Sequence, residues 1–184
     1  MQLVDKPNWH CAAWLKSISL TRNEKYWLTF HESMTEKLTQ LFDQEINIQV
    51  LSSQFSTAKN YENAALSLLP RSTIFLREVE IYCNQTLWMF ARTTIPRNML
   101  KGKLRFLTKL GNKPLGKVLF ANPQLKRGPF FYTQLTKKHA LFHKSCQHLP
   151  HKPEKLWARY SIFTLDNQQL MLTEIFLPEY FRWR

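Results

Sequence analysis

The segment from residue 74 to residue 95 constrains this chain most, because it has the pattern of a β-hairpin that would bury two arginines. Two runs rich in β-branched, aromatic and other apolar residues flank Asn84-Gln85, which is suited to a tight turn. With these two residues at the centre of the turn, the antiparallel register places Arg77 opposite Arg92. The hairpin therefore predicts two guanidinium groups side by side on an apolar face.

The predicted register leaves both arginines without an acid on their own face. Side chains alternate between the two faces of a strand, so Glu78 and Glu80 are expected to point the other way. Like charges opposed across two strands are destabilising, and a guanidinium among apolar side chains needs an anion. The pattern therefore indicates that a negatively charged group is missing.

The composition favours one soluble domain spanning residues 1–184. A chain of 184 residues with 44% hydrophobic and 14% aromatic content can bury a substantial core. The sequence contains no apolar run long enough to cross a membrane and no signal-peptide pattern at its start. Cys11, Cys83 and Cys146 lack the spacing of a disulfide framework or a zinc motif. We therefore expect an intracellular protein in a reducing compartment.

Positive charge is concentrated in one part of the chain. The net charge is +13, and residues 97–155 contain 14 Lys or Arg but one acid, whereas the remainder contains 12 basic and 12 acidic residues. This distribution is compatible with a solvated basic surface, with attraction of a small anionic substrate, or with nucleic-acid binding. The charge alone does not decide between them.

The order of elements predicts an α+β fold with an antiparallel sheet of about six strands and helices packed on one side. Thr21 and Glu24 have the spacing of a capping box before a helix that continues to Phe42. The other expected elements are a strand at 46–50, a polar connection up to Pro70, the double-arginine hairpin, helices at 98–110 and 114–120, a strand at 130–132, a histidine-rich loop at 136–153, and a final hairpin of 159–165 and 170–177 that turns over 166–169.

Four further features could belong to a site or have a purely structural role. Glu174 lies on an apolar strand face with Leu172, and it is either a structural ion-pair residue or part of a ligand cavity. In a cavity that also contained both arginines, one positive charge would be left for an organic anion. The segment 113–116 is a loop-to-helix junction or a carboxylate site. Met34 lies on the apolar stripe of its helix, where a core position is the default. The histidines of 139–151 could be imagined as a metal cluster, but the expected loop offers no second ordered ligand pair.

Five motifs, together with Leu119-Phe120, resemble the chorismate lyase (chorismate pyruvate-lyase) family. They occur in the same order from about Trp27 to Pro178, and the ordered combination is more specific than any one of them. The motifs are His31-Glu-Ser-Met-Thr35, Leu76-Arg-Glu-Val79, Trp88-Met-Phe-Ala-Arg-Thr-Thr-Ile-Pro96, Leu110-Gly-Asn-Lys-Pro-Leu-Gly116 and Leu172-Thr-Glu-Ile-Phe-Leu-Pro178.

The resemblance implies a lyase that converts chorismate to 4-hydroxybenzoate and pyruvate, toward the ubiquinone head group, in the bacterial cytoplasm. It implies no metal and no organic cofactor. By resemblance Arg77 binds the ring carboxylate with the backbone N–H groups of Met34 and Leu115, Glu174 meets the ring oxygen, and Arg92 binds the enolpyruvyl carboxylate. Glu174 and Arg92 are thus the expected catalytic residues. We expect a monomer without nucleic-acid binding or membrane insertion.

The basic loop at about 136–154 is longer than the family pattern, so it is expected to be an insertion that alters what covers the ligand. A non-catalytic protein of the same fold that binds a phenolic acid is the alternative, and retention of Arg77, Arg92 and Glu174 together is evidence against it. Nucleic-acid binding is a third hypothesis, weakened because the basic residues are not interleaved with aromatics in a known module.

Overall fold

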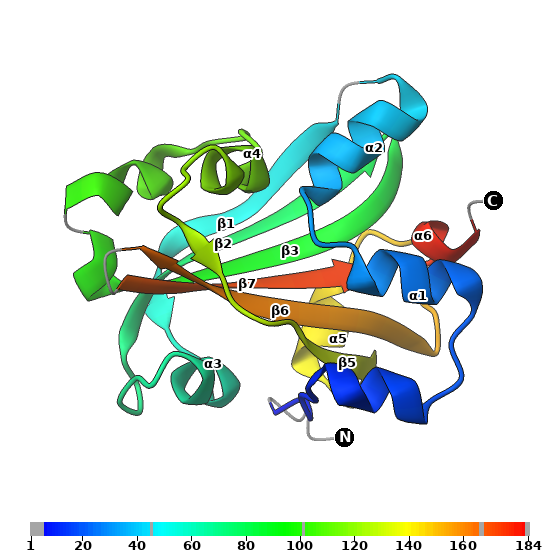
Figure 1. The fold of residues 1–184 in the computed structure, drawn as a ribbon, viewed down its shortest axis with the longest axis horizontal. Helices are drawn as coiled ribbons and strands as arrows, with labels where there is room; N and C mark the ends of the chain where they lie inside the picture. Colours follow the sequence, from blue (N-terminus) through cyan, green and yellow to red (C-terminus); the bar gives the residue numbers. More distant parts are fainter. Residues whose placement is uncertain (1–5, 45, 101, 166–167, 183–184) are drawn as a thin grey trace.

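A seven-stranded antiparallel sheet is the centre of the computed structural model, which describes residues 6–44, 46–100, 102–165 and 168–182 (Figure 1). The strands run in the order β1-β2-β3-β7-β6-β4, and β5 also pairs with β6. Their bounds are β1 Asn47–Thr57, β2 Thr73–Cys83, β3 Thr86–Pro96, β4 Lys126–Arg127, β5 Phe131–Thr136, β6 Lys155–Leu165 and β7 Gln168–Phe176. The predicted α+β class with an antiparallel sheet is confirmed.

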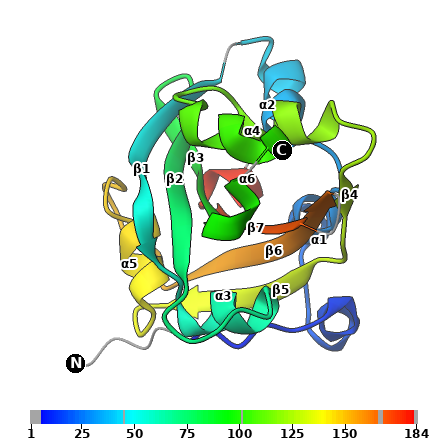
Figure 2. The same cartoon turned by 90° about the vertical axis from the view of Figure 1, so that its left-hand side faces the viewer.

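Helices cover both faces of this curved sheet, not one face as the sequence suggested (Figure 2). In Figure 2 the sheet bends around α4, while α3 and α5 lie outside the bend. The helical elements are η1 Ala12–Ser17, α1 Arg22–Thr29, α2 Met34–Phe42, α3 Asn60–Ala65, η2 Arg97–Leu100, η3 Gly102–Lys109, α4 Leu115–Phe120, α5 Ala140–Ser145 and α6 Glu179–Arg182. Among the described residues, no helix has the length and apolar character needed to span a membrane.

The hairpin of β2 and β3 turns at the residues that the sequence indicated. Asn84 and Gln85 have φ angles of 51° and 65°, the positive values that a type I′ turn requires. Next to the turn, Tyr82 pairs with Leu87, but Ile81, one residue farther from the turn, pairs with Met89. Trp88 is therefore an extra residue in β3, and its carbonyl instead accepts a hydrogen bond of 3.0 Å from Leu177.

This β-bulge makes the predicted register of the hairpin wrong. Arg77 pairs with Thr93 and Arg92 pairs with Glu78, so the two arginines lie on opposite faces of the sheet. The expectation that Glu78 could not neutralise either arginine is wrong for the same reason. One inserted residue moves every side chain beyond it to the other face of the strand.

The region predicted as one helix up to Phe42 contains two helices. The capping box of Thr21 and Glu24 is confirmed at the start of α1, with both of its hydrogen bonds present. A short extended segment then separates α1 from α2, and the Ser33 side chain caps α2 by accepting a hydrogen bond from the backbone N–H of Glu36. The second cap orients α2 independently of α1.

Other element boundaries differ from the prediction, because short helices lie in segments expected to be loops and some strands are longer than expected. β1 extends to Thr57, and α3 lies in the expected polar connection before Pro70. Residues 97–100 and 102–109 form two 3-10 helices instead of one α-helix, whereas the helix predicted near 114–120 is present as α4. The expected loop of 136–153 contains α5, which buries Leu141 and Phe142. The final hairpin is present, although residues 166–167 of its predicted turn lie outside the described residues.

We predict that Gln85→Gly stabilises the protein by about 1 kcal/mol, because glycine adopts a positive φ without the clash of a Cβ atom. The matched control is Thr86→Gly, which places glycine in a strand and should destabilise by roughly 0.5–1 kcal/mol. Urea denaturation of both variants tests this. Equal effects of the two substitutions would contradict the turn geometry.

Candidate functional site

A mostly apolar cavity lies between the sheet and helices α2 and α4. It contains about 500 Å³ of space unoccupied by protein atoms, part of it open to solvent. Three charged side chains, Arg77, Arg127 and Glu174, interrupt its apolar wall. The other lining residues are Met34, Thr35, Ile48, Val79, Ile81, Met89, Ala91, Thr93, Leu115, Gly116, Phe120 and Leu172. A concave apolar site with a few convergent charges is typical of a small-molecule site.

Arg77 is a buried cation in this cavity without an acidic partner among the described residues. It is 3% exposed, and its Nη2 donates to the backbone carbonyls of Gly111 and Lys113, each at 3.0 Å. Its buried Nε has no hydrogen-bond partner in the part of the chain that the structure describes. Burial lowers the pKa of Arg77 to about 10. The side chain is therefore held in place by carbonyls and is ready to receive an anion.

Met34 and Leu115 join Arg77 in the cavity wall from two helix starts. Each is the first residue of its helix, after Ser33 and Pro114 respectively. The first N–H groups of a helix have no partner within the helix, so they are available to an anion. The sequence-predicted binding residues Met34, Arg77, Leu115 and Glu174 thus lie around one cavity.

Glu174 lies on β7 and its carboxylate is bound by two arginines. Its Oε2 accepts hydrogen bonds of 2.8 Å from Arg159 Nε and 3.0 Å from Arg127 Nη2. Burial raises the pKa of Glu174, but the two guanidinium groups outweigh burial and hold it below its ordinary value. The carboxylate is therefore ionised and suited to accept a hydrogen bond.

Arg159 positions Glu174 from the neighbouring strand. It pairs directly with Glu174 across β6 and β7 and is fully buried. Its Nη1 donates to three carbonyls at the end of α1, including that of Phe30 at 2.6 Å. A cation at a helix C-terminus is stabilising. Arg159 therefore ties the carboxylate to α1 without lining the cavity itself.

Sequence reasoning missed Arg127 and Arg159. The pairing of Arg159 with Glu174 could have been found if the last turn had been centred on 166–167, since β7 already begins at Gln168. Arg127 carried no comparable signal, because it lies on a two-residue strand inside the basic segment. Its position depends on packing between β4 and β6.

Arg77 and Glu174 lie far enough apart to bind opposite ends of a small molecule. Arg77 of β2 pairs with Thr93 of β3, and Thr93 pairs with Leu172 of β7. Glu174 follows Leu172 by two residues on β7. Two strand spacings and two residues along a strand separate their Cα atoms by roughly 12 Å. Side chains at these two positions can therefore contact opposite ends of a benzoate-sized ring.

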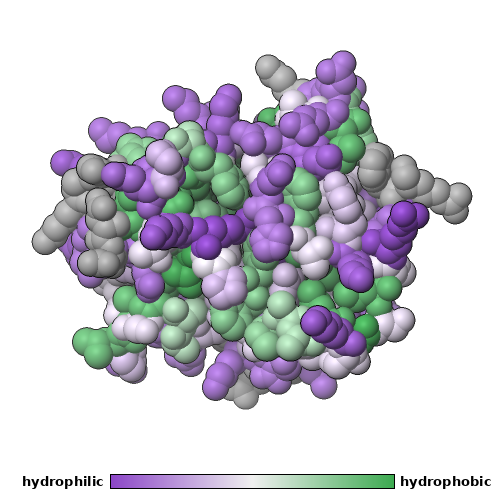
Figure 3. Space-filling view, in the orientation of Figure 1, coloured by the Kyte–Doolittle hydropathy of each residue, from purple (hydrophilic) through white to green (hydrophobic). Residues whose placement is uncertain are grey.

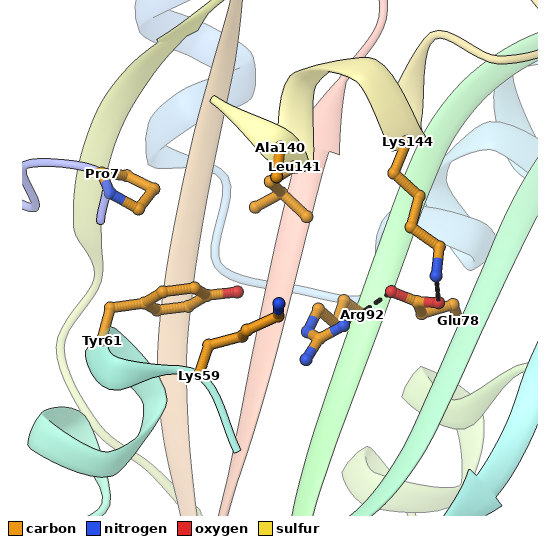
Figure 4. A pocket seen from close by; sticks show the side chains of 8 residues that line it. All are labelled: Pro7, Lys59, Tyr61, Glu78, Arg92, Ala140, Leu141 and Lys144. Carbon is orange, nitrogen blue, oxygen red and sulfur yellow. Dashed lines mark hydrogen bonds and ion pairs between the residues drawn. The ribbon is translucent and has the colours of Figure 1, made fainter. Parts of the chain in front are cut away.

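Arg92 does not lie in this cavity, which corrects its predicted place beside Arg77. It lines a separate hollow on the opposite face, between the sheet, α3 and α5 (Figure 4). Its guanidinium binds both oxygens of Glu62, at 2.7 and 3.0 Å, and Oε1 of Glu78 at 2.7 Å. Lys144 from α5 forms an ion pair with the same Glu78. Arg92 is thus fully neutralised by residues of the protein.

Comparison with solved structures defines the class of fold. Crystal structures of PhnF from Mycobacterium smegmatis and of its effector domain share the fold, with TM-scores of 0.60 and 0.58 at 9% and 8% identity. The matches cover 83% and 80% of this chain and 66% and 90% of those chains. The protein is thus an α+β domain that shares the fold of these structures and has a buried, positively charged cavity.

Comparison of sequences identifies the family. The chorismate lyase family model matches residues 3–183. A probable chorismate pyruvate-lyase of Nitrosospira multiformis is 35% identical over 97% of both chains, and the chorismate pyruvate-lyase of Pectobacterium carotovorum is 33% identical over 83% of this chain and 76% of its own. The chain belongs to the chorismate lyase family.

We predict that Arg92→Met destabilises the protein by about 3–5 kcal/mol, because it leaves the buried carboxylates of Glu62 and Glu78 without their shared cation. The control is Arg182→Gln, which removes an exposed Arg–Glu pair and should cost less than about 1 kcal/mol. Urea denaturation measures both. A loss below about 1 kcal/mol for Arg92→Met would contradict the buried network.

We predict that Glu174→Gln loses about 3 kcal/mol of stability at pH 7, since Arg127 and Arg159 then lack their acid. The pKa of Glu174 is lowered on folding, so its ionised form stabilises the protein above about pH 4.5, and this contribution is lost as pH falls further. The difference in free energy of unfolding between wild type and variant should therefore decrease below pH 4.5, as measured by denaturation at several pH values. Glu179→Gln, at an exposed pair, should show no such convergence.

Proposed function

We propose that this protein converts chorismate to 4-hydroxybenzoate and pyruvate, as a cytoplasmic monomer that needs no metal or organic cofactor and feeds the ubiquinone head group. One observation carries the proposal: Arg77, a buried guanidinium without an acidic partner among the described residues, shares its cavity with an ionised Glu174. Such a cavity holds a carboxylate at one end and a hydroxyl at the other. The product has these two groups in para positions.

The charge of the site supports a dianionic substrate. Arg77, Arg127 and Arg159 contribute three positive charges, and Glu174 contributes one negative charge. The surplus of two is reached without Arg92, which its own carboxylates neutralise on the other face. Chorismate carries two carboxylates, so its binding completes the charge balance of the buried site.

We assign the ring carboxylate to Arg77 and the N–H groups of Met34 and Leu115. The ring hydroxyl donates a hydrogen bond to Glu174, whose Oε1 has no hydrogen-bond partner among the described residues. These contacts fix the ring in one orientation and hold its reacting carbons in the dry part of the cavity. Arg92 has no part in this assignment.

The reaction needs little from the protein beyond binding and charge stabilisation. The ether bond at C3 breaks, its electron pair leaves with the enolpyruvyl oxygen, and loss of the proton at C4 makes the ring aromatic. The enolate takes up one proton and becomes pyruvate, so atoms and charge balance. Aromatisation supplies much of the driving force. Glu174, being ionised, acts as a hydrogen-bond acceptor beside C4 and not as an acid.

Basic side chains around the cavity favour approach of an anion. Lys109, Lys113, Lys117 and Lys126 are exposed on or beside the elements that cover it. Along the upper edge of Figure 3, above α2 and α4, the visible side chains are mostly hydrophilic. This arrangement favours the interpretation of the positive segment as attraction of a small anionic substrate.

The test is to incubate purified protein with chorismate and follow 4-hydroxybenzoate and pyruvate by chromatography. We expect equal amounts of both products, and a fall in kcat/KM of roughly 10²–10³ in Arg77→Met, which loses the ring-carboxylate contact. Lys113→Gln, an exposed neighbour, should retain most activity. No product above the spontaneous background would overturn the lyase proposal, whereas tight 4-hydroxybenzoate binding without turnover would support the alternative of a phenolic-acid-binding protein.

A further inference from the structure

We infer that Arg127 is a further catalytic residue, which binds the carboxylate of the departing enolpyruvyl group. This inference rests on the proposed chorismate lyase activity. It gives Arg127 the task that the sequence suggested for Arg92. Four observations support it: the contacts of the guanidinium, the rings around it, its place beside Glu174, and the positions of the substituents on the chorismate ring.

The Arg127 guanidinium is held rigidly but keeps two N–H donors. Its Nε donates to Ser161 at 2.9 Å, Nη1 to the carbonyl of His31 at 2.9 Å, and Nη2 to Glu174 at 3.0 Å. A guanidinium has five N–H donors, so one donor on each Nη atom has no partner among the described residues. Because Arg127 lines the cavity, these two donors can form a bidentate pair with a carboxylate there.

Aromatic rings surround the same guanidinium. Its central carbon lies 4.1 Å from the ring centre of Phe130, 5.1 Å from that of Phe163 and 5.6 Å from that of Phe120. Stacked rings fix the plane of the group and displace water from it, and a charge with little water interacts more strongly with an incoming anion. Burial also lowers the pKa of Arg127 to about 10. The group is thus preorganised and incompletely neutralised.

The geometry of chorismate places the departing group near Arg127. The enolpyruvyl ether is attached to C3, next to the carbon that carries the hydroxyl, while the ring carboxylate lies at the other end. With the hydroxyl at Glu174, the ether oxygen is one ring carbon away. Arg127 and Arg159 are the two arginines bonded to Glu174, and of these Arg127 lines the cavity. Arg159 instead directs its Nη1 to the end of α1.

Such a contact would lower the barrier to breaking the ether bond. As the C3–O bond breaks, negative charge grows on the enolpyruvyl oxygen beside its own carboxylate. A fixed guanidinium at the carboxylate stabilises both charges more in the transition state than in the bound substrate, because the second charge appears only during the reaction. The proton lost from C4 is balanced by the one that the enolate takes up to become pyruvate.

Arg127→Gln tests this assignment, because glutamine keeps hydrogen-bond donors and removes the charge. We expect kcat/KM for chorismate to fall about 10²–10³-fold. Affinity for 4-hydroxybenzoate, which has no enolpyruvyl group, should change less than about threefold, whereas Arg77→Met should weaken both. Lys155→Gln is the control, since it removes an exposed charge from β6, the strand that pairs with β4. Thermal denaturation reports whether each variant is folded.

A substrate analogue gives a readout that a structural role of Arg127 would not change. For the wild type, kcat/KM should be lower with chorismate esterified on its side-chain carboxylate than with chorismate. This fall should equal the fall that Arg127→Gln causes with chorismate. For the Arg127→Gln variant, kcat/KM should differ little between the ester and chorismate. Equal wild-type rates for ester and chorismate would overturn the inference, even if Arg127→Gln does not fold. A parallel loss of 4-hydroxybenzoate affinity in Arg127→Gln would also overturn it, and would make Arg127 a positioning residue for Glu174. A wild type without lyase activity would refute the proposed function instead.

Discussion

The single extra residue in β3 decides what each buried arginine of this protein can do. The bulge at Trp88 shifts the pairing of β2 and β3, so that Arg77 points to the cavity and Arg92 to the opposite face. The Trp88 ring packs against Phe42 and Tyr180, which anchors the bulge to α2 and α6. Without it, two like charges would share one face, an arrangement that strand pairing disfavours. The separation of the two arginines onto opposite faces of the sheet depends on this irregularity.

The two faces handle buried charge in opposite ways. Behind the sheet, the charge of Arg92 is neutralised by Glu62 and Glu78, and the network connects α3 and α5 to the strands. In the cavity, the partners of Arg77 in the described part of the chain are backbone carbonyls, and Glu174 is shared by two arginines. A neutral ion cluster needs no ligand, whereas an excess of buried positive charge does. This contrast, and not the presence of arginine, distinguishes a structural site from a binding site.

Local patterns in the sequence predicted the parts of the fold that local interactions determine. The capping box, the turn at Asn84-Gln85, α4 and the final hairpin depend on short-range hydrogen bonds and alternation, and the structure contains each of them. The cavity also brings together Met34, Leu115, Arg77 and Glu174 as expected. The bulge could not be predicted, because Trp88 suits either face of an apolar strand and is fixed by contacts with distant helices. Arg127 was missed for the same reason: its hydrogen-bond partners come from three segments that are distant in the sequence.

Sharing Glu174 between two arginines has a consequence for the chemistry of such a site. A lone carboxylate in an apolar cavity tends to take up a proton, and it would then donate to the ring hydroxyl instead of accepting from it. Arg159 prevents this from a position outside the cavity, where its Nε binds Glu174 and its Nη1 donates to the end of α1. Arg127 can therefore keep two donors for a ligand while the carboxylate stays ionised. Arg159 thus keeps Glu174 ionised, and Arg127 remains available to a ligand. Fixed charges on a rigid sheet are therefore sufficient to assist an elimination that is driven by aromatisation.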